Sequence, residues 1–378
     1  MTHPCDALVL GAGINGLATA WQLLRRGVER VVVVEQNPLF HSRGSSHGHT
    51  RITRSSYGDP MWVELMLLAH GVEWPALEAE AGTPLRTPRA GCFWGPESGP
   101  MARWLDAVTR VGAPVRRLSV NEARGVFPAF RFEEDDLILR DESAAVIHAA
   151  QTLRALAGRV KALGGVIAEG VRVLDLEPRP GHTRVTTSSG VFEAGRVVVT
   201  AGPWTAKLLP GLQGRLRVTR QSVGYLRFEG DTDGLPPWIW QGSGDDNNYY
   251  GLPSMGRPGA KVALHRTLGP ADDPDDRYDA EPEVWAVMDW ARQRFAWTLT
   301  GVVGSEACHY TNTHDEVFVL DAAPGLPGVV VGAGFSGHGF KFGPLTGRIL
   351  AELVMDGVTT VAPFEAHRAR FAASGRGG

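Results

Sequence analysis

The pattern of apolar and polar positions near the start of the chain predicts a strand, a turn, a helix and a second strand. Residues 6–10 (DALVL) and 31–35 (VVVVE) are short apolar runs typical of buried strands. The segment between them places apolar side chains on one face of a helix, at Leu17, Ala20, Trp21 and Leu24. This order predicts a β-α-β unit and so favours an α/β (α+β) fold with a Rossmann-like layer.

Three later stretches extend this layer. Residues 154–177 predict a helix, a loop and a strand, and residues 195–209 predict a buried strand running into Gly202 and a new helix. Residues 327–357 predict an apolar strand, a glycine-rich loop and a helix that ends at Gly357. We therefore expect the layer to be assembled from separated pieces of chain.

A second domain is predicted from strand-like stretches rich in aromatic residues, at 89–95, 220–228 and 236–254. They suit an antiparallel or mixed sheet interleaved with the first domain. We expect the first domain to comprise residues 1–85, 145–212 and 312–378. The second domain then comprises residues 86–144 and 213–311.

Composition and charge indicate a small-molecule partner. The 378 residues are 43% hydrophobic and 21% charged. The 38 Lys and Arg residues nearly balance the 41 Asp and Glu residues, so nothing indicates a nucleic-acid or membrane partner. No run approaches 18 apolar residues and the first residues lack the basic region of a signal peptide, so we expect a cytoplasmic protein. The acidic run 271–283 is predicted to be an exposed loop leading into a helix that begins at Pro282.

The cysteines of the chain are too few and too widely spaced for a disulfide framework or a thiolate metal site. They are Cys5, Cys92 and Cys308. Their odd number fits a reducing compartment, and we predict no metal site.

The glycines of the first turn form a dinucleotide-binding pattern. Gly11, Gly13 and Gly16 stand as G-x-G-x-x-G between the predicted strand and helix, and Glu35 ends the next strand. The first glycine permits the tight turn, the second lets a pyrophosphate approach the backbone, and the third allows close packing. Glu35 is placed to accept hydrogen bonds from a ribose, which favours FAD or NAD over NADP.

Five stretches in order make the chain resemble the monomeric sarcosine oxidase family of amine-oxidising flavoproteins along essentially its whole length. They are GAGINGLATAWQL at 11–23, GSSHGHTRITRSSYG at 44–58, YYGLPSMGRPGAKVALH at 249–265, ACHYTNTHDEVFVLD at 307–321 and GFSGHGFKFGPLTG at 334–347. The resemblance implies an FAD-binding domain of the p-hydroxybenzoate-hydroxylase type, a substrate domain on a mixed sheet, and a monomer. The family also includes oxidases of N-methyltryptophan and pipecolate, so membership does not fix the substrate.

Cys308 is the cysteine to which the resemblance assigns a function. A lone cysteine is ordinarily an inert buried residue, and nothing beside Cys308 in the sequence indicates a depressed thiol pKa. The resemblance places Cys308 where the family attaches FAD through the sulfur to the 8α carbon of the isoalloxazine ring. Cys5 and Cys92 have no such match.

Two arginines three residues apart and a distant lysine are candidates for charge recognition. An amino acid brings a carboxylate into a dry pocket, where it needs cations, and the fork of an arginine matches two carboxylate oxygens. The resemblance implies that Arg54 and Lys341 hold this carboxylate, with Lys341 also near the cofactor. It implies that Arg51 packs near the flavin ring, where a cation stabilises the reduced anionic ring. Without the resemblance, Arg51, Arg54 and Lys341 would each be interpreted as a charged residue on the surface.

Three further residues match the family spacing. Lys261 and His265 are four apart in an extended segment, so their side chains point to the same side. The resemblance implies that Tyr250 and His265 order the substrate amine and carboxylate, and that Lys261 receives dioxygen beside flavin N5. Without the family resemblance, we would interpret Tyr250 and His265 as ordinary core residues.

Other positions either match or depart from the family. The resemblance implies further cofactor contacts from Ser45, Thr50, Val173, Gly337 and Gly339. His49 stands where relatives often carry an acid. The run that contains Trp238, Trp240 and Gln241 does not match the sarcosine enzymes well, which weakens the case for sarcosine itself.

We expect an FAD-dependent oxidase that converts the amine of an amino acid, secondary or N-methyl, to an imine and reduces dioxygen to hydrogen peroxide. Alternatives are a dehydrogenase of the same fold with a non-oxygen acceptor, a cyclic amino acid oxidase of the pipecolate type, and a flavin-bearing sensing protein without turnover. The glycine pattern alone would also permit a further alternative, an NAD-linked dehydrogenase.

Overall fold

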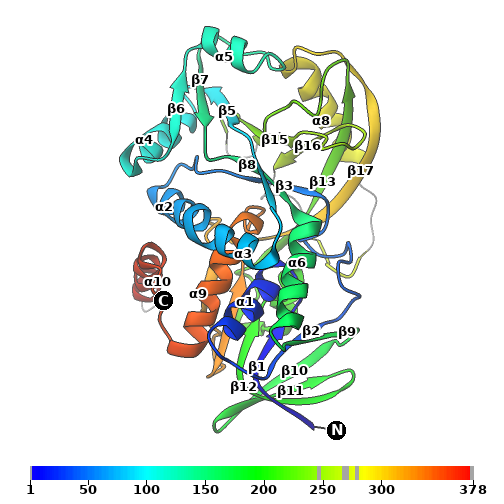
Figure 1. The fold of residues 1–378 in the computed structure, drawn as a ribbon, viewed down its shortest axis with the longest axis vertical. Coiled ribbons are helices and arrows are strands. Elements are labelled where there is room, and N and C mark those ends of the chain that lie inside the picture. Colours follow the sequence, from blue (N-terminus) through cyan, green and yellow to red (C-terminus); the bar gives the residue numbers. More distant parts are fainter. Residues whose placement is uncertain (1, 245–247, 266–271, 277–280, 375–378) are drawn as a thin grey trace.

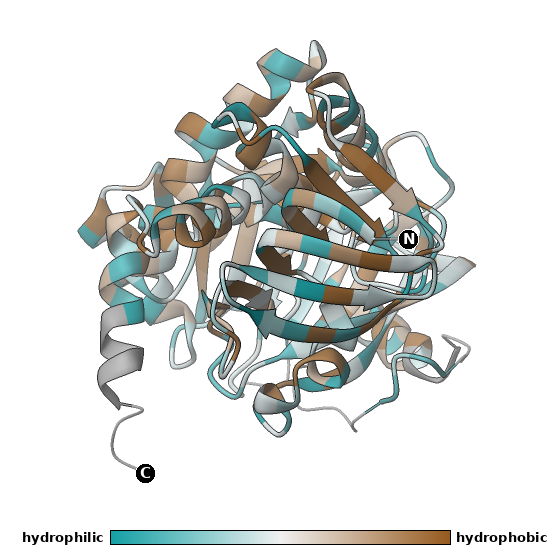
Figure 2. Ribbon diagram, turned by 90° about the horizontal axis from the view of Figure 1, so that it is seen from below, coloured by the Kyte–Doolittle hydropathy of each residue, from teal (hydrophilic) through white to brown (hydrophobic). Residues whose placement is uncertain are grey.

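The computed structural model describes residues 2–244, 248–265, 272–276 and 281–374. Two large sheets lie at opposite ends of the molecule in Figure 1, with a small sheet and several helices between them. Apolar residues concentrate on the inner strands and helix faces, whereas hydrophilic residues mark the outer loops (Figure 2). None of the described helices combines the length and the apolar character needed to cross a membrane.

The first sheet is the predicted Rossmann-like layer. Its eight described strands are β1 (Thr2–Leu10), β2 (Val31–Glu35), β9 (Val166–Glu169), β10 (Val173–Arg179), β11 (His182–Thr187), β12 (Gly190–Val199), β18 (Val319–Ala322) and β19 (Val329–Ala333). Parallel pairing joins β9, β2, β1, β12 and β19, and β10, β11 and β18 extend the sheet by antiparallel pairing. As the sequence predicts, the parallel strands come from separated pieces of chain.

Helices α1 (Ile14–Arg25), α6 (Ala149–Ala162) and α9 (Gly343–Asp356) pack beside this sheet (Figure 1). The predicted face of α1 is buried, with Leu17, Ala20, Trp21 and Leu24 in the core. Helix α9 ends where the sequence predicts, because Gly357 takes the left-handed conformation that closes a helix. The chain also forms α2 (Pro60–Leu68), a π-helical turn η1 (Ala69–Glu73), α3 (Trp74–Ala81), α7 (Thr205–Leu208) and α10 (Ala362–Ser374), and the 3-10 turns η2 (Gly202–Trp204), η3 (Pro210–Leu212) and η4 (Phe340–Phe342).

The second sheet is the predicted aromatic one. In spatial order it contains β17 (Leu299–Asn312), β13 (Arg217–Phe228), β16 (Ala260–His265), β15 (Asn248–Leu252), β14 (Trp238–Gln241), β5 (Gly91–Pro96), β7 (Asp136–Asp141) and β6 (Val115–Leu118). All pairs are antiparallel except β14 with β5, so the sheet is mixed. Helices α4 (Met101–Val111), α5 (Val120–Val126) and α8 (Glu281–Arg294) belong to the same end of the molecule.

Trp238 and Trp240 serve the core of this second sheet. Their rings pack with Trp290 of α8, and the Trp238 ring stacks on it with centroids 4.9 Å apart. Ile239 and Gln241 alternate with them along β14 and line the main cavity described below. The strand that departs from the family pattern therefore gives two residues to the core and two to the cavity.

A small antiparallel sheet of β3 (Thr50–Thr53), β8 (Ala145–His148) and β4 (Arg86–Pro88) lies between the large sheets. The predicted domain boundaries near 85 and 145 fall within or beside its strands, and the division of the chain into those domains stays a prediction. The acidic run is described in part: Asp273 and Asp275 form ion pairs with Lys207, at 2.6 and 2.7 Å. Residues 271 and 277–280 of that run lie outside the described residues, and α8 begins at Glu281, one residue before Pro282.

Candidate active site

One cavity of about 850 Å³ extends from the glycine turn of the first sheet to the inner side of the second sheet. Fourteen of the predicted site residues line it: Gly11, Gly13, Glu35, Ser45, Arg51, Arg54, Val173, Tyr250, Lys261, His265, Cys308, Gly337, Gly339 and Lys341. Residues from the first and the last parts of the chain thus line a single cavity. The dinucleotide-binding features lie at one end of this cavity, and buried cations lie at its other end.

The glycine turn has the close packing that the sequence predicts. Gly11 adopts φ +105°, and a Cβ there would lie 2.5 Å from the carbonyl oxygen of Thr200. A Cβ on Gly16 would lie 1.9 Å from the carbonyl oxygen of Gly11, so only glycine fits at either position. Gly16 therefore acts by packing and does not line the cavity.

The start of α1 opens into the cavity. The backbone N–H of Ile14 donates to the hydroxyl of Ser46 at 3.1 Å, and a Cβ on Gly13 would lie 3.1 Å from the same oxygen. Helix α1 has no acidic residue in its first turn, so the positive end of its dipole is available to a phosphate. These contacts fit the pyrophosphate of FAD.

Glu35 is held at the end of β2. Its carboxylate accepts hydrogen bonds from the backbone N–H groups of Ala12 and Asn37, both at 3.0 Å, and lies 3.4 Å from His41 Nε2. Burial alone would raise the pKa of Glu35, but the hydrogen bonds from His41, Ala12 and Asn37 outweigh it and lower the pKa. The residue is therefore an ionised acceptor at the place where a ribose is expected.

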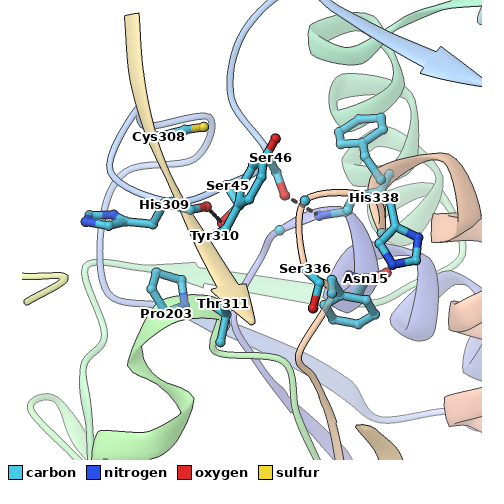
Figure 3. Close-up of a pocket in the computed structure, with 18 of the residues that line it drawn as sticks. Asn15, Ser45, Ser46, Pro203, Cys308, His309, Tyr310, Thr311, Ser336 and His338 are labelled. Atoms are coloured by element: carbon cyan, nitrogen blue, oxygen red, sulfur yellow. Dashed lines mark hydrogen bonds between the residues drawn. The ribbon is translucent and has the colours of Figure 1, made fainter. Parts of the chain in front are cut away.

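Cys308 lies on β17 and lines the cavity (Figure 3). On the next residue, the carbonyl of His309 accepts a 2.5 Å hydrogen bond from the Ser45 hydroxyl, which fixes the 44–58 loop against the strand. The other two cysteines do not reach the cavity: burial raises the pKa of the Cys5 thiol to about 11 and that of Cys92 well above its usual value. Those two are inert core residues.

Arg51 lines the cavity and is held by backbone carbonyls of its own loop. Its guanidinium donates to the backbone carbonyls of Thr50 (2.9 Å), Ser45 (3.0 Å) and His47 (2.5 Å), and it lies 5.3 Å from the centroid of the Phe340 ring. The side chain therefore locks the loop that carries it. Thr50 itself does not line this cavity; it lines a smaller one beside it.

Arg54 is a buried cation that forms no ion pair within 4.0 Å with any acid in the described part of the chain. It is 7% exposed, its Cζ lies 3.9 Å from the centroid of the Tyr57 ring and 4.5 Å from that of Trp104, and its Nε and Nη1 atoms have no hydrogen-bond partner within the described chain. Unpaired buried donors are costly and rare in folded proteins. The arrangement fits a site that receives a carboxylate.

Lys341 lies beside Arg54 and shares its tyrosine. The ammonium donates a 3.1 Å hydrogen bond to the Tyr57 hydroxyl. Burial, together with the charge of Arg54, holds the pKa of Lys341 well below its usual value. An anion bound between the two cations would reverse this effect, so carboxylate binding and lysine protonation favour each other.

Tyr57 and His338 are site residues that the sequence did not single out. The Nε2 atom of His338 donates to the carbonyl of Glu316 (3.1 Å), which leaves Nδ1 to accept from the Tyr57 hydroxyl at 3.4 Å. The Tyr57 oxygen is then free to accept from Lys341. Both residues lie inside the stretches that resemble the family, and that position was the signal that could have found them.

The predicted residues Tyr250 and His265 line the cavity and are joined by Tyr310, a third residue that the sequence did not single out. His265 Nδ1 lies 3.4 Å from the Tyr310 hydroxyl, and a Cβ on Gly337 would lie 2.2 Å from the Tyr310 ring and 2.8 Å from the His265 ring. Burial raises the pKa of Tyr250 to about 12, and burial with the charges of Lys341 and Arg54 lowers that of His265 to about 4. At neutral pH these groups are uncharged hydrogen-bonding partners.

Lys261 is a third buried cation of the cavity, 5% exposed, on β16. Burial, helped by the charge of Arg51 and opposed by Cys308 and Glu306, lowers its pKa to about 7. It lines the main cavity and the smaller one, where His49 and Thr50 also lie.

A glycine turn at a helix start, an ionised acid at the end of the next strand and a cavity that continues to the second sheet define a class of dinucleotide-dependent enzymes. A family model described as FAD dependent oxidoreductase matches residues 6–353. Peroxisomal sarcosine oxidase of Homo sapiens is 35% identical over 379 residues, covering 96% of each chain, and monomeric sarcosine oxidase of Bacillus sp. (strain B-0618) is 30% identical over 372 residues, covering 95% of this chain and 94% of its own.

The chain belongs to the FAD-dependent oxidoreductase family and, within it, to the monomeric sarcosine oxidases. Among solved structures, NikD, an unusual amino acid oxidase essential for nikkomycin biosynthesis, superposes with a TM-score of 0.81 at 25% identity, covering 95% of both chains. The predicted fold class, FAD dependence and enzyme class are confirmed.

Proposed function

We propose that the protein oxidises the amine of an amino acid, secondary or N-methyl, to an imine that water then hydrolyses. The relatives named sarcosine oxidase support an N-methyl substrate, and the NikD likeness supports an amino acid. When bound, FAD supplies the chemistry by taking a hydride from the carbon next to nitrogen and passing two electrons to dioxygen, which leaves as hydrogen peroxide. The observation that carries the proposal is the buried Arg54, which lies beside Lys341 and whose Nε and Nη1 atoms have no hydrogen-bond partner among the described residues.

Arg54 and Lys341 would bind the substrate carboxylate. Both are more than nine-tenths buried, and the apolar rings around Arg54 exclude water, so a carboxylate between them gains charge-assisted hydrogen bonds in a poorly screened place. This contact fixes one end of the substrate and so orients its amine toward Tyr250 and His265.

The same cations would keep the substrate amine neutral. Each disfavours a further positive charge nearby, and His265, already uncharged, adds none. A neutral amine keeps its lone pair, which drives loss of the hydride. In this proposal His265, Tyr310 and Tyr250 hydrogen-bond the amine without charging it.

Lys261 would serve the oxygen half of the reaction. In its protonated form it stabilises the negative charge that develops on dioxygen during the first electron transfer. Its depressed pKa means that this form is present at neutral pH and is lost as pH rises.

We further propose that Cys308 carries FAD covalently. The sulfur would form a bond to the 8α carbon. The thiol would lose its proton, and the methyl group of the ring would lose a hydride. Dioxygen would finally accept the two electrons of that hydride. Support comes from the family match and from the position of Cys308 in the cavity, in contrast to Cys5 and Cys92.

An anaerobic screen of N-methyl, cyclic and primary amino acids tests this function by bleaching of the flavin absorption. We expect bleaching by at least one N-methyl or cyclic amino acid and stoichiometric peroxide when air is admitted. Bleaching without peroxide would show a dehydrogenase instead, and failure of every amino acid to bleach would overturn the proposal.

Two further properties stay proposals. We propose a monomer, since a bacterial relative is named monomeric, and a cytoplasmic location, although the human relative is named peroxisomal. Light scattering and cell fractionation test them.

A further inference from the structure

A second cavity, of about 220 Å³, adjoins the main one and shares Lys261 with it. It lies where the start of α6, the start of β3 and the 253–259 loop meet. Liquid water occupies about 30 Å³ per molecule, so the space can hold a small ion with several waters.

The lining of this smaller cavity is strongly basic. It contains His49, His148, Arg154, Arg257 and Lys261. No Asp or Glu occurs among the described residues that line it. The charge of Glu306 acts on His49 and Lys261, but this residue does not line the cavity, and its carboxylate accepts a hydrogen bond from Tyr225. The potential inside the cavity therefore favours an anion.

The start of α6 adds to this potential. Ala150 and Gln151 line the cavity, the 14-residue helix has no acidic residue in its first turn, and no side chain caps its N-terminus. The N–H of Ala149 is already bonded to the carbonyl of His49 at 2.8 Å. The positive end of the helix dipole therefore faces the cavity, as at many anion sites.

Lys261 provides an independent observation. The residue is only 5% exposed and lines the smaller cavity, and its ammonium takes part in none of the hydrogen bonds or ion pairs found among the described residues. A buried ammonium without an acceptor is costly, and an anion in the cavity would supply one.

We propose that the smaller cavity binds a small inorganic oxyanion of the sulfate or phosphate class, held by Arg154, Arg257 and the start of α6 above Lys261. Arg154 and Arg257 are exposed at its opening, so an ion can enter from solvent without passing the amino acid site. A tetrahedral oxyanion offers enough acceptors for both guanidinium groups and the helix N–H groups together.

Occupancy would change the oxygen half of the reaction. A negative charge beside Lys261 offsets the charge that this lysine presents to dioxygen, so reoxidation slows while reduction by substrate does not. This consequence rests on the proposed role of Lys261, whereas binding of the ion does not.

Crystals of the holoenzyme soaked in selenate test the site through anomalous scattering. We expect a selenium peak between Arg154, Arg257 and the start of α6. Absence of a selenium peak from the smaller cavity would overturn the proposal. A peak only between Arg54 and Lys341 would also overturn it, because the oxyanion would then prefer the carboxylate site.

Equilibrium dialysis with radiolabelled sulfate gives the second measurement. We expect the Arg154→Ala/Arg257→Ala holoenzyme to bind sulfate at least tenfold more weakly than wild type. The matched Arg215→Ala/Arg217→Ala variant removes two exposed arginines that line neither cavity and should bind as wild type does. Equal weakening in both variants would show a general charge effect and overturn the site.

Stopped-flow reoxidation in the same three proteins completes the test. Sulfate should slow reoxidation of the wild type and the matched control, and the Arg154→Ala/Arg257→Ala variant should be insensitive to it. If the ion binds but reoxidation is unaffected, the link to Lys261 is wrong. If no amino acid reduces the flavin, the proposed function fails while the binding result stands.

Discussion

The Lys341 ammonium donates a 3.1 Å hydrogen bond to the Tyr57 hydroxyl. The same tyrosine presents its ring to the Arg54 guanidinium at 3.9 Å, so one side chain positions both cations of the proposed carboxylate site. The link joins the two ends of the chain, since Arg54 and Tyr57 precede α2 and Lys341 precedes α9.

Tyr57→Phe separates these two contacts. The ring that supports Arg54 remains, but Lys341 loses its acceptor, and a net hydrogen-bond loss of about 0.5–1.5 kcal/mol should weaken carboxylate binding several-fold. Tyr57→Leu removes both contacts and should weaken it further. Titration of the flavin spectrum with a carboxylate inhibitor measures the effect, and equal affinities for wild type and Tyr57→Phe would contradict it.

Arg54→Ala and Lys341→Ala should each weaken substrate binding by about 2–5 kcal/mol, because either change leaves a buried carboxylate short of a charged partner. Amines without a carboxylate should be poor substrates of the wild type. Arg103→Ala is the control, since this arginine lines the cavity but is exposed and its charge is screened by water. A carboxylate inhibitor that binds Arg54→Ala as tightly as wild type would remove Arg54 from the site.

Lys261→Met should slow flavin reoxidation far more than anaerobic reduction, as followed by stopped-flow absorbance of each half-reaction. The pKa of Lys261 is about 7, and the charged form lies below it. Wild-type reoxidation should therefore be fastest at low pH and fall as pH rises through about 7, and Lys261→Met should lose this dependence. Equal slowing of both half-reactions would show that Lys261 only shapes the pocket and does not activate dioxygen.

Cys308→Ala should release flavin to the supernatant when the protein is precipitated with acid, whereas the wild-type pellet should stay yellow. Cys5→Ala is the control, because this cysteine is buried in the first sheet and does not line the cavity. A colourless wild-type pellet is the result that rules out covalent attachment.

Gly16→Ala should yield protein that is unstable or lacks FAD, because the new methyl group would overlap the backbone of Gly11. Gly158→Ala is the matched control: it lies in α6 with open space around it, and alanine there should stabilise the helix by up to about 1 kcal/mol. Thermal unfolding and the flavin-to-protein absorbance ratio measure both effects. Normal FAD content in Gly16→Ala would show that the turn can relax.

Local patterns account for what the sequence predicted well. The turn at Gly11 and the helix end at Gly357 each depend on neighbours within a few residues, so their residue types were sufficient. Tyr57 and Tyr310 could not be found in this way, because a tyrosine outside its contacts looks like any core aromatic. Their roles come from partners hundreds of residues or several strands away. The basic lining around Lys261 was equally hidden, since His49, His148 and Arg257 come from three separate segments.

The loop before α9 has a consequence for engineering. Gly337 makes room for the Tyr310 and His265 rings, and four residues later the same loop delivers Lys341 to the carboxylate site. One short segment of backbone therefore makes room for the His265 ring and places Lys341 beside Tyr57. We expect a library that varies this loop to change the accepted amino acid to lose flavin in many members, because the sequence predicts cofactor contacts from Gly337 and Gly339, so selection should score colour before turnover.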